Sequence, residues 1–263
     1  VKDFEEISGF GIKANINNHQ ILAGNSKLMN LKNIKFTEKE NLGTVIYIAF
    51  DGQYIGNILI SDEIKEDAKR AIKELKNKYK GKRVGVAKDG AFSFYYESNL
   101  ELMRFSGLEI VEFSPVKDEK IPENLDMIYL GGGYPELYWK ELSENVSMKE
   151  SIKQAYENGV KIYGECGGFI YLTNKLNLLD GNSGNFCGII DVEISMKNRL
   201  NIGRFGYINI KTENGICTKG HEFHYSEISV DNEKEKFYKI EKNDGRNWNC
   251  GYRKKSLLAG YPH

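Results

Sequence analysis

The sequence places one cysteine at a sharp turn between a strand-like run and a helix-like run. Residues 160–163 form a mainly apolar run, and the motif Gly-Glu-Cys-Gly-Gly, centred on Cys166, follows them directly. Glycines on both sides of a residue remove the Cβ clashes that arise where a strand and a helix nearly touch. The pattern predicts a nucleophile elbow in which Cys166 supplies a thiol in place of a hydroxyl. The alternative is a buried structural cysteine at a tight turn.

Backbone N–H groups near this thiol could assist its chemistry. A helix that begins at Gly167 is expected to lower the pKa of the thiol and to present free N–H groups. A second glycine cluster, residues 131–133, also follows an apolar strand-like run. The amides of Gly132, Gly133 and Gly167 are therefore predicted to hold an oxyanion. A phosphate-binding loop is the alternative, but the sequence contains no Gly-x-x-x-x-Gly-Lys-Ser/Thr motif.

A cysteine nucleophile needs a base, and four histidines are available: His19, His221, His224 and His263. His19 lies beside a turn near the start of the chain and is expected to be a solvated loop residue. His221 and His224 share a strand-like segment, where residues three apart point to opposite faces. We therefore predict no metal site.

The elements around these residues indicate an α/β fold. Strand-like and helix-like runs alternate at residues 83–87, 95–105, 108–113, 127–130, 148–158 and 160–163. Such alternation predicts a parallel sheet covered on both faces, and sites in these sheets lie beyond the carboxyl ends of the strands. Both glycine clusters lie there. A late apolar run, residues 256–261, is expected to form another strand, and the chain from residue 188 onward consists mainly of strands and turns.

The segment before residue 80 has a different, small α+β pattern. Asn17-Asn18 and Asp51-Gly52 each join two strand-like runs, and a helical stripe follows at residues 68–75. The pattern changes at residues 77–82, which predicts two domains, 1–80 and 81–263. A Gly-x-Gly pair at Gly9 and Gly11 is a weak nucleotide-binding signal, for which a tight turn is the alternative reading.

The composition excludes several functional classes. Of the 263 residues, 37 are Lys or Arg and 37 are Asp or Glu. The chain therefore has no excess of positive charge that would predict binding to nucleic acid or to a membrane. No apolar run is long enough for a membrane span, and the charged first residues do not form a signal peptide. The four cysteines form no Cys-x-x-Cys pair. A cytoplasmic protein is expected, and the absence of an initial Met predicts a fragment.

Residues 82–263 resemble the glutamine amidotransferase domain of the cobyrinate a,c-diamide synthases, a class I relative in cobalamin biosynthesis. The resemblance rests on a series of ordered blocks at residues 84–96, 113–118, 130–136, 164–172, 206–207, 220–226 and 258–263. It implies a flavodoxin-like domain that hydrolyses glutamine to supply ammonia. It also implies a partner, the synthetase domain or chain that carries the corrinoid and uses ATP and Mg²⁺, which this chain is expected to lack. No cofactor is expected in the chain itself.

The resemblance also bears on the choice of base. Related cobyric acid synthases carry the base in a late block that ends in histidine, which here is residues 256–263. It therefore implies that His263 is the base, with His224 as the alternative, and that Glu165, His221 and His224 support the catalytic pair. The acid two residues past the base, usual in this class, would lie beyond His263. The site is then expected either to work as a Cys–His dyad or to be impaired.

Residues 1–78 resemble part of the nucleotide-binding region of heavy-metal P-type ATPases. The matching blocks are residues 4–14, 22–29 and 51–75. The segment has no Asp-Lys-Thr-Gly-Thr, Thr-Gly-Asp-Asn or Cys-Pro-Cys motif, so no pump cycle is expected. Two alternatives to the amidotransferase remain at this point, a nucleotide-binding ATPase fragment and an inactive fusion product.

Overall fold

A computed structural model describes residues 3–7, 9–38, 44–60, 66–200, 203–233 and 236–263 of the chain. The contacts divide the chain into two compact units, Val1–Lys69 and Arg70–His263. Each unit has its own hydrophobic core. The two are described separately below.

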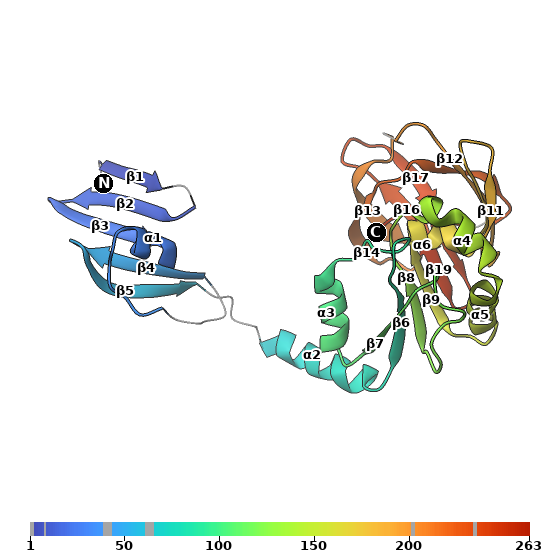
Figure 1. The fold of residues 1–263 in the computed structure, drawn as a ribbon, viewed down its shortest axis with the longest axis horizontal. Helices are drawn as coiled ribbons and strands as arrows, with labels where there is room; N and C mark the ends of the chain where they lie inside the picture. Colours follow the sequence, from blue (N-terminus) through green and yellow to red (C-terminus); the bar gives the residue numbers. More distant parts are fainter. Residues whose placement is uncertain (1–2, 8, 39–43, 61–65, 201–202, 234–235) are drawn as a thin grey trace. The chain divides into compact units, whose positions relative to one another are not determined.

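The first unit is an antiparallel meander of five strands in chain order (Figure 1): β1 (Asp3–Ile7), β2 (Gly11–Ile16), β3 (His19–Gly24), β4 (Thr44–Phe50) and β5 (Gln53–Ile60). Asn17 and Asn18 have φ of 51° and 65°, and Asp51 and Gly52 have 46° and 78°. Positive φ at both central residues marks the two-residue hairpin turns that the sequence predicted at these positions. Helix α1 (Ser26–Leu31) contributes Leu28 and Met29 to the small core.

Helix α2 (Glu66–Tyr79) contains the predicted helical stripe. The contacts assign residues 70–79 to the second unit, whereas the sequence pattern places the junction near residue 80. Within the second unit, Lys76 Nζ lies 4.5 Å from the centroid of the Phe105 ring. A Cβ added at Gly107 would lie 3.0 Å from the Lys76 carbonyl oxygen. The second half of α2 therefore packs on the loop that follows α3 (Glu97–Phe105).

The second unit is built on a six-stranded sheet in the order β18–β19–β9–β8–β6–β7. Its parallel strands are β6 (Arg83–Ala87), β7 (Glu109–Phe113), β8 (Met127–Leu130), β9 (Lys161–Glu165) and β19 (Leu257–Gly260). In chain order these strands lie 2-1-3-4-5, which is the flavodoxin-like arrangement. Strand β18 (Tyr252–Lys254) adds an antiparallel edge. The predicted α/β class and all five parallel strands are confirmed.

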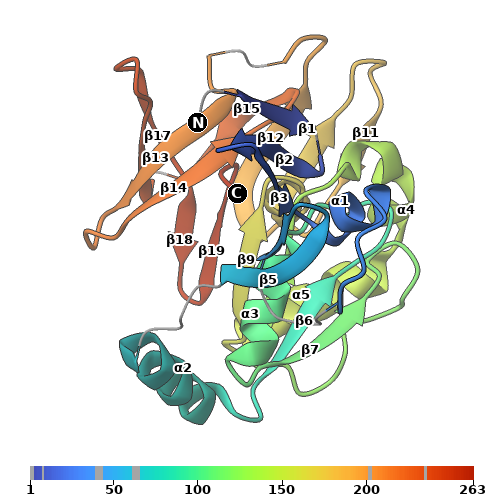
Figure 2. The same ribbon diagram turned by 90° about the vertical axis from the view of Figure 1, so that its left-hand side faces the viewer.

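Helices cover both faces of this sheet (Figures 1 and 2). On one face Val84 and Val86 pack with Leu100 of α3. On the other face Ile128 and Ile162 pack in the cluster that includes α5 (Val146–Glu157) and α6 (Gly167–Leu172). The 3₁₀ turn η1 (Pro135–Tyr138) and α4 (Trp139–Glu144) follow β8. Burial of both faces explains why β6, β8 and β19 are mainly apolar runs in the sequence.

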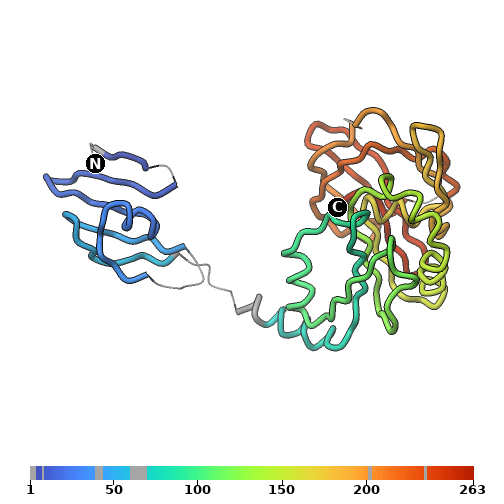
Figure 3. The backbone as a smooth tube through the Cα atoms, viewed as in Figure 1, coloured from blue at the N-terminus to red at the C-terminus, as the bar shows by residue number. Residues whose placement is uncertain are grey.

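Two four-stranded sheets complete the second unit. One has the order β11–β10–β12–β15, with β10 (Thr173–Asn177), β11 (Ser183–Asn185), β12 (Ile190–Met196) and β15 (Ser226–Asp231). The other has the order β14–β13–β16–β17, with β13 (Gly206–Thr212), β14 (Cys217–Glu222), β16 (Tyr238–Glu241) and β17 (Asn247–Cys250). The backbone trace ends inside this unit (Figure 3), where His263 pairs with His221 of β14.

Candidate active site

Cys166 lies at the turn between β9 and α6, in a backbone conformation that few side chains adopt. Its φ and ψ are 45° and −100°. A non-glycine residue with positive φ outside the usual regions marks local strain, which often accompanies a functional group. The surrounding glycines are required by space, since a Cβ on Gly168 would lie 2.0 Å from the Leu130 carbonyl oxygen and one on Gly164 would lie 2.7 Å from Leu172 Cδ1. The strand, sharp turn and helix predicted from the sequence are all present.

The thiol is buried and needs a partner to ionise. Cys166 is 8% exposed, and its Sγ lies 3.8 Å from the Phe223 carbonyl oxygen. Burial, together with nearby carboxylates such as Glu136, raises the pKa of this thiol to about 12, and the Gly167 N–H opposes the shift. The sequence-based expectation of a lowered thiol pKa is therefore wrong for the free protein. The short helix cannot offset the loss of water around the sulfur.

The glycine loop after β8 lies against the elbow. The Gly168 N–H donates to the Gly131 carbonyl at 2.9 Å. A Cβ on Gly167 would lie 3.0 Å from the backbone nitrogen of Gly133, and a Cβ on Gly133 would lie 2.0 Å from the Ala91 carbonyl oxygen. The two glycine clusters therefore pack backbone to backbone. A side chain at Gly167 would press on the Gly133 backbone, and one at Gly133 would clash with the backbone of Ala91.

His263 is brought to the same place by β19, the strand predicted at residues 256–261. Strand β19 runs parallel to β9, and the Cys166 N–H donates to the Gly260 carbonyl at 2.9 Å. The main chain of His263 exchanges two hydrogen bonds with His221, of 2.7 and 3.0 Å. Burial lowers the pKa of His263, while the Tyr261 carbonyl and the Glu222 carboxylate oppose that shift.

One cavity of about 370 Å³ unites most of the predicted residues. Its lining comes from six separate parts of the chain: Phe94, Tyr96, Gly132, Gly133, Tyr134, Cys166, Tyr207, His221, Phe223 and His263. Aromatic rings form half of this lining. None of these five Phe and Tyr rings was predicted as a site residue, although all five fall within the blocks that carried the resemblance.

His221 and His224 have different surroundings. The His221 ring lies 5.4 Å from the His263 ring, and burial together with His263 lowers the pKa of His221. His224 lies between β14 and β15 rather than inside a strand, it is 6% exposed, and it does not line the larger cavity. It lines a small cavity of about 40 Å³, and Cys166 lines the same cavity. No group of three or more His, Cys, Asp or Glu that could hold a metal ion occurs in the described part of the chain.

Glu165 precedes the cysteine but takes part in a different set of contacts. Its carboxylate accepts hydrogen bonds from the hydroxyls of Tyr129 at 2.6 Å and Tyr163 at 2.9 Å. Burial raises the pKa of Glu165, and the two tyrosine hydroxyls oppose the shift. It does not line the cavity that contains Cys166 and His263. Its contacts join β8 and β9 below the elbow.

The residues predicted in the first unit have packing roles. Gly11 lies opposite Gly24 in the β2–β3 register, and a Cβ on Gly11 would lie 2.3 Å from the Ala23 carbonyl oxygen. The Gly9 carbonyl accepts a hydrogen bond of 2.9 Å from the Asn25 side chain. His19 is exposed, as expected, but it begins strand β3 rather than lying in a loop, and its Nδ1 lies 2.6 Å from Asp51 Oδ2.

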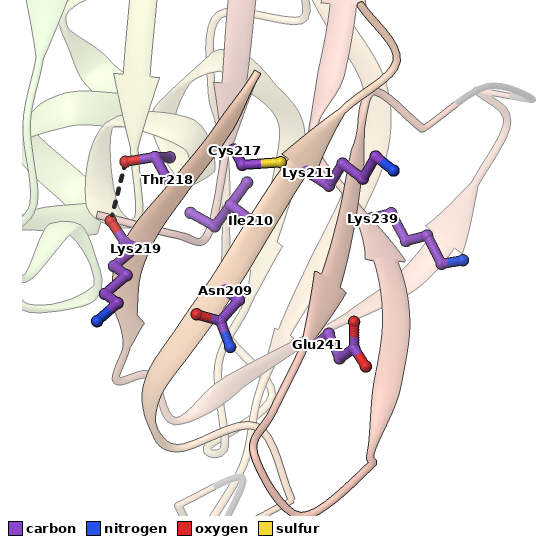
Figure 4. A pocket seen from close by; sticks show the side chains of 8 residues that line it. All are labelled: Asn209, Ile210, Lys211, Cys217, Thr218, Lys219, Lys239 and Glu241. Atoms are coloured by element: carbon purple, nitrogen blue, oxygen red, sulfur yellow. Dashed lines mark hydrogen bonds between the residues drawn. The ribbon is translucent and has the colours of Figure 1, made fainter. Parts of the chain in front are cut away.

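A second hollow, of about 410 Å³, lies on the sheet that contains β13 and β14. Figure 4 shows its polar lining, in which Lys211 and Lys239 come from neighbouring strands. The hollow contains none of the predicted site residues and neither a described nucleophile with a base nor a buried charge. Of these two cavities, the one that contains Cys166 and His263 is therefore the better candidate site.

A family model described as the CobB/CobQ-like glutamine amidotransferase domain matches residues 83–263. The chain belongs to this family. Similar curated proteins are cobyrinate a,c-diamide synthases. The protein of Fusobacterium nucleatum is 48% identical over 193 residues, which are 73% of this chain and 43% of that protein. The protein of Caldanaerobacter subterraneus is 39% identical over 206 residues, covering 76% and 44%.

The amidotransferase chain thus spans less than half the length of these relatives. A solved glutamine amidotransferase structure matches with a TM-score of 0.51 at 17% identity, over 68% of this chain and 89% of that one, which supports the fold. Among the described helices, none combines the length and apolar character needed to cross a membrane.

Proposed function

We propose that the second unit hydrolyses the side-chain amide of glutamine, with Cys166 as nucleophile and His263 as base. The observation that carries this proposal is the shared cavity, in which a strained cysteine, a histidine and the glycine loop meet. The buried thiol is protonated at neutral pH, so it needs a neighbouring base to become a nucleophile. His263, whose pKa is lowered, is neutral there and can accept that proton.

In the first half of the reaction, His263 removes the thiol proton and the sulfur attacks the amide carbon. The oxyanion that forms is held by backbone N–H groups of Gly132, Gly133 and Gly167. The carbon–nitrogen bond then breaks, and His263 returns the proton to the departing nitrogen, which leaves as ammonia. A glutamyl thioester remains on Cys166.

In the second half, His263 takes a proton from water, and the resulting hydroxide attacks the thioester carbon. The carbon–sulfur bond breaks, the thiolate recovers the proton, and glutamate leaves. The sum is glutamine plus water giving glutamate plus ammonia.

We further propose that the ammonia is used in an ATP-dependent amidation of the a and c carboxylates of a corrinoid, as the name of the relatives suggests. The relatives are more than twice as long as the matched region, so a synthetase domain or chain is the proposed partner. The described residues offer no carboxylate cluster for Mg²⁺, and the sequence has no P-loop motif. We therefore assign the ATP-dependent step to the partner and not to this chain. We also propose that the chain acts in the cytoplasm.

For residues 1–80 we propose an origin in the nucleotide-binding region of a heavy-metal P-type ATPase, as a domain separate from residues 81–263. Gly9 and Gly11 are the residues that would approach a nucleotide. Their packing against Gly24 and Asn25 accounts for both glycines without a ligand. The amidotransferase is therefore the better supported function.

Ammonia release from glutamine and ATP binding should be measured on the same preparation of the full chain. Ammonia release that is lost in Cys166→Ser would support the amidotransferase. ATP binding without ammonia release, and without labelling of Cys166 by a glutamine-mimicking electrophile, would contradict it.

A further inference from the structure

The ring of His263 is oriented by a main-chain carbonyl. His263 Nδ1 lies 3.4 Å from the Tyr261 carbonyl oxygen. A carbonyl oxygen can only accept a hydrogen bond, so this contact requires the proton to be on Nδ1. The neutral ring then has its free lone pair on Nε2. This is the arrangement that a carboxylate imposes on the histidine of a catalytic triad.

Tyr261 itself is held firmly in the interior. Its side chain is 0% exposed. Its ring stacks on that of His224 with centroids 3.8 Å apart and planes 12° apart, and it meets Phe169 edge to face at 5.0 Å. Its hydroxyl lies 3.0 Å from Ser226 Oγ. The carbonyl that faces His263 therefore belongs to a residue fixed on several sides.

His224 is fixed in turn by both ring nitrogens. The Nδ1–H donates to the Ser226 carbonyl at 2.8 Å, and Nε2 lies 3.4 Å from the Glu222 carboxylate. Glu222 is 0% exposed and accepts a further hydrogen bond of 3.3 Å from Trp248 Nε1. We call Glu222, His224 and Ser226 the tyrosine clamp.

We infer that the Tyr261 carbonyl replaces the acid of a catalytic triad, and that the tyrosine clamp positions this carbonyl. This inference rests on the proposed role of His263 as base. Tyr261, Glu222, His224 and Ser226 are positioning residues, because they act on His263 rather than on glutamine. The clamp also gives His224 a role other than that of the base. The sequence had left the choice of base open between His224 and His263.

The tautomer of His263 tests the first half of the inference directly. Nitrogen-15 NMR of the full chain, labelled at histidine, distinguishes a proton on Nδ1 from one on Nε2, and His263→Gln identifies the signal. We expect the neutral ring to carry its proton on Nδ1. A neutral ring with its proton on Nε2 would overturn the inference. The measurement needs no turnover, so it identifies the tautomer even if the chain releases no ammonia and the proposed function fails.

Two variants test the clamp. His224→Asn removes the stacked ring, and Tyr261→Phe removes only the hydroxyl link to Ser226. We expect kcat to fall about tenfold in the first and about threefold in the second with little change in KM, since positioning of a base acts on the chemical step. The population of the Nδ1 tautomer of His263 should fall more in His224→Asn than in Tyr261→Phe.

Tyr252→Phe is the matched control. It also removes a buried tyrosine hydroxyl, one that donates to Asp231 at 3.0 Å and belongs to a ring stacked on Phe169, but it does not contact the clamp. If kcat falls as much in Tyr252→Phe as in Tyr261→Phe, the effect comes from general packing and the clamp is overturned. An unchanged tautomer and kcat in both clamp variants would overturn the clamp. If His224→Asn does not fold, Tyr261→Phe and the wild-type tautomer still decide the question.

Discussion

Glycine loops occur in both units, and they differ in what lies beside them. In the first unit, Gly11 faces Gly24 across two strands, and the Phe10 carbonyl accepts a hydrogen bond of 2.9 Å from the Asn25 N–H. In the second unit, Gly132 and Gly133 border an open cavity next to Cys166. Both loops exclude a Cβ by close backbone contact. Only the second places its backbone next to a nucleophile and a histidine, so glycine spacing alone does not mark a site.

The largest expected effect is that of Cys166→Ser. We expect ammonia release from glutamine to fall at least about 10⁴-fold, because a buried serine hydroxyl is far less readily ionised than a thiol. Mass spectrometry after treatment with a glutamine-mimicking electrophile should show the label on Cys166 in the wild type. Cys217→Ser, at an exposed cysteine, is the control. Preferential labelling of Cys187, Cys217 or Cys250 would contradict the elbow assignment.

Substitution of one glycine in each loop sharpens the comparison. A Cβ at Gly133 would lie 2.0 Å from the Ala91 carbonyl oxygen, so Gly133→Ala must displace the loop. We expect about a 100-fold loss of kcat/KM, similar to the loss of an oxyanion-hole donor. Gly11→Ala meets a similar clash in the first unit, at 2.3 Å. It should destabilise that unit by about 2 kcal/mol, within the range for overpacking.

The decisive result is the ammonia assay of these two variants. Gly11→Ala should release ammonia at the wild-type rate, because its clash lies outside the unit that contains Cys166. Equal losses in both variants would break the distinction between the loops.

The pH dependence of ammonia release reports on His263. Burial lowers the pKa of His263 below 6.5, so the ring is already neutral in mildly acidic solution. The base is active only when neutral, so kcat/KM should rise with pH through the lowered pKa and level off before neutrality. Rates measured from mildly acidic to mildly alkaline solution would show this acidic limb. A limb on the alkaline side of neutrality would instead indicate a base without this buried environment.

The smallest effect concerns the junction between the units. Sequence pattern places it at residues 77–82, and the contacts place it at residues 69–70. We expect limited trypsin digestion to cut near residues 78–82 and to leave a folded fragment that starts around Gly81. Amino-terminal sequencing of the stable fragment measures this. A fragment that starts near residue 70 would show that α2 is an integral part of the second unit.

The sequence alone determined the local features of this protein. Strands β6 and β8 are mainly apolar runs, and they begin and end where the sequence pattern does. The glycines around Cys166 specify a turn with no room for side chains, and Asp51-Gly52 specifies a two-residue hairpin. These features depend on neighbours within a few residues, which is why pattern and spacing reveal them.

Only the tertiary structure decided what surrounds the two histidines and the thiol. His221 and His263 are 42 residues apart, yet their main chains form two hydrogen bonds. Glu222 was not predicted, because nothing in its neighbours shows that β17 brings Trp248 to it and that it is fully buried. The raised pKa of Cys166 has the same origin, since desolvation depends on every segment packed around the sulfur. Spacing along the chain singled out Cys166 as the proposed nucleophile, and packing between distant strands set its environment.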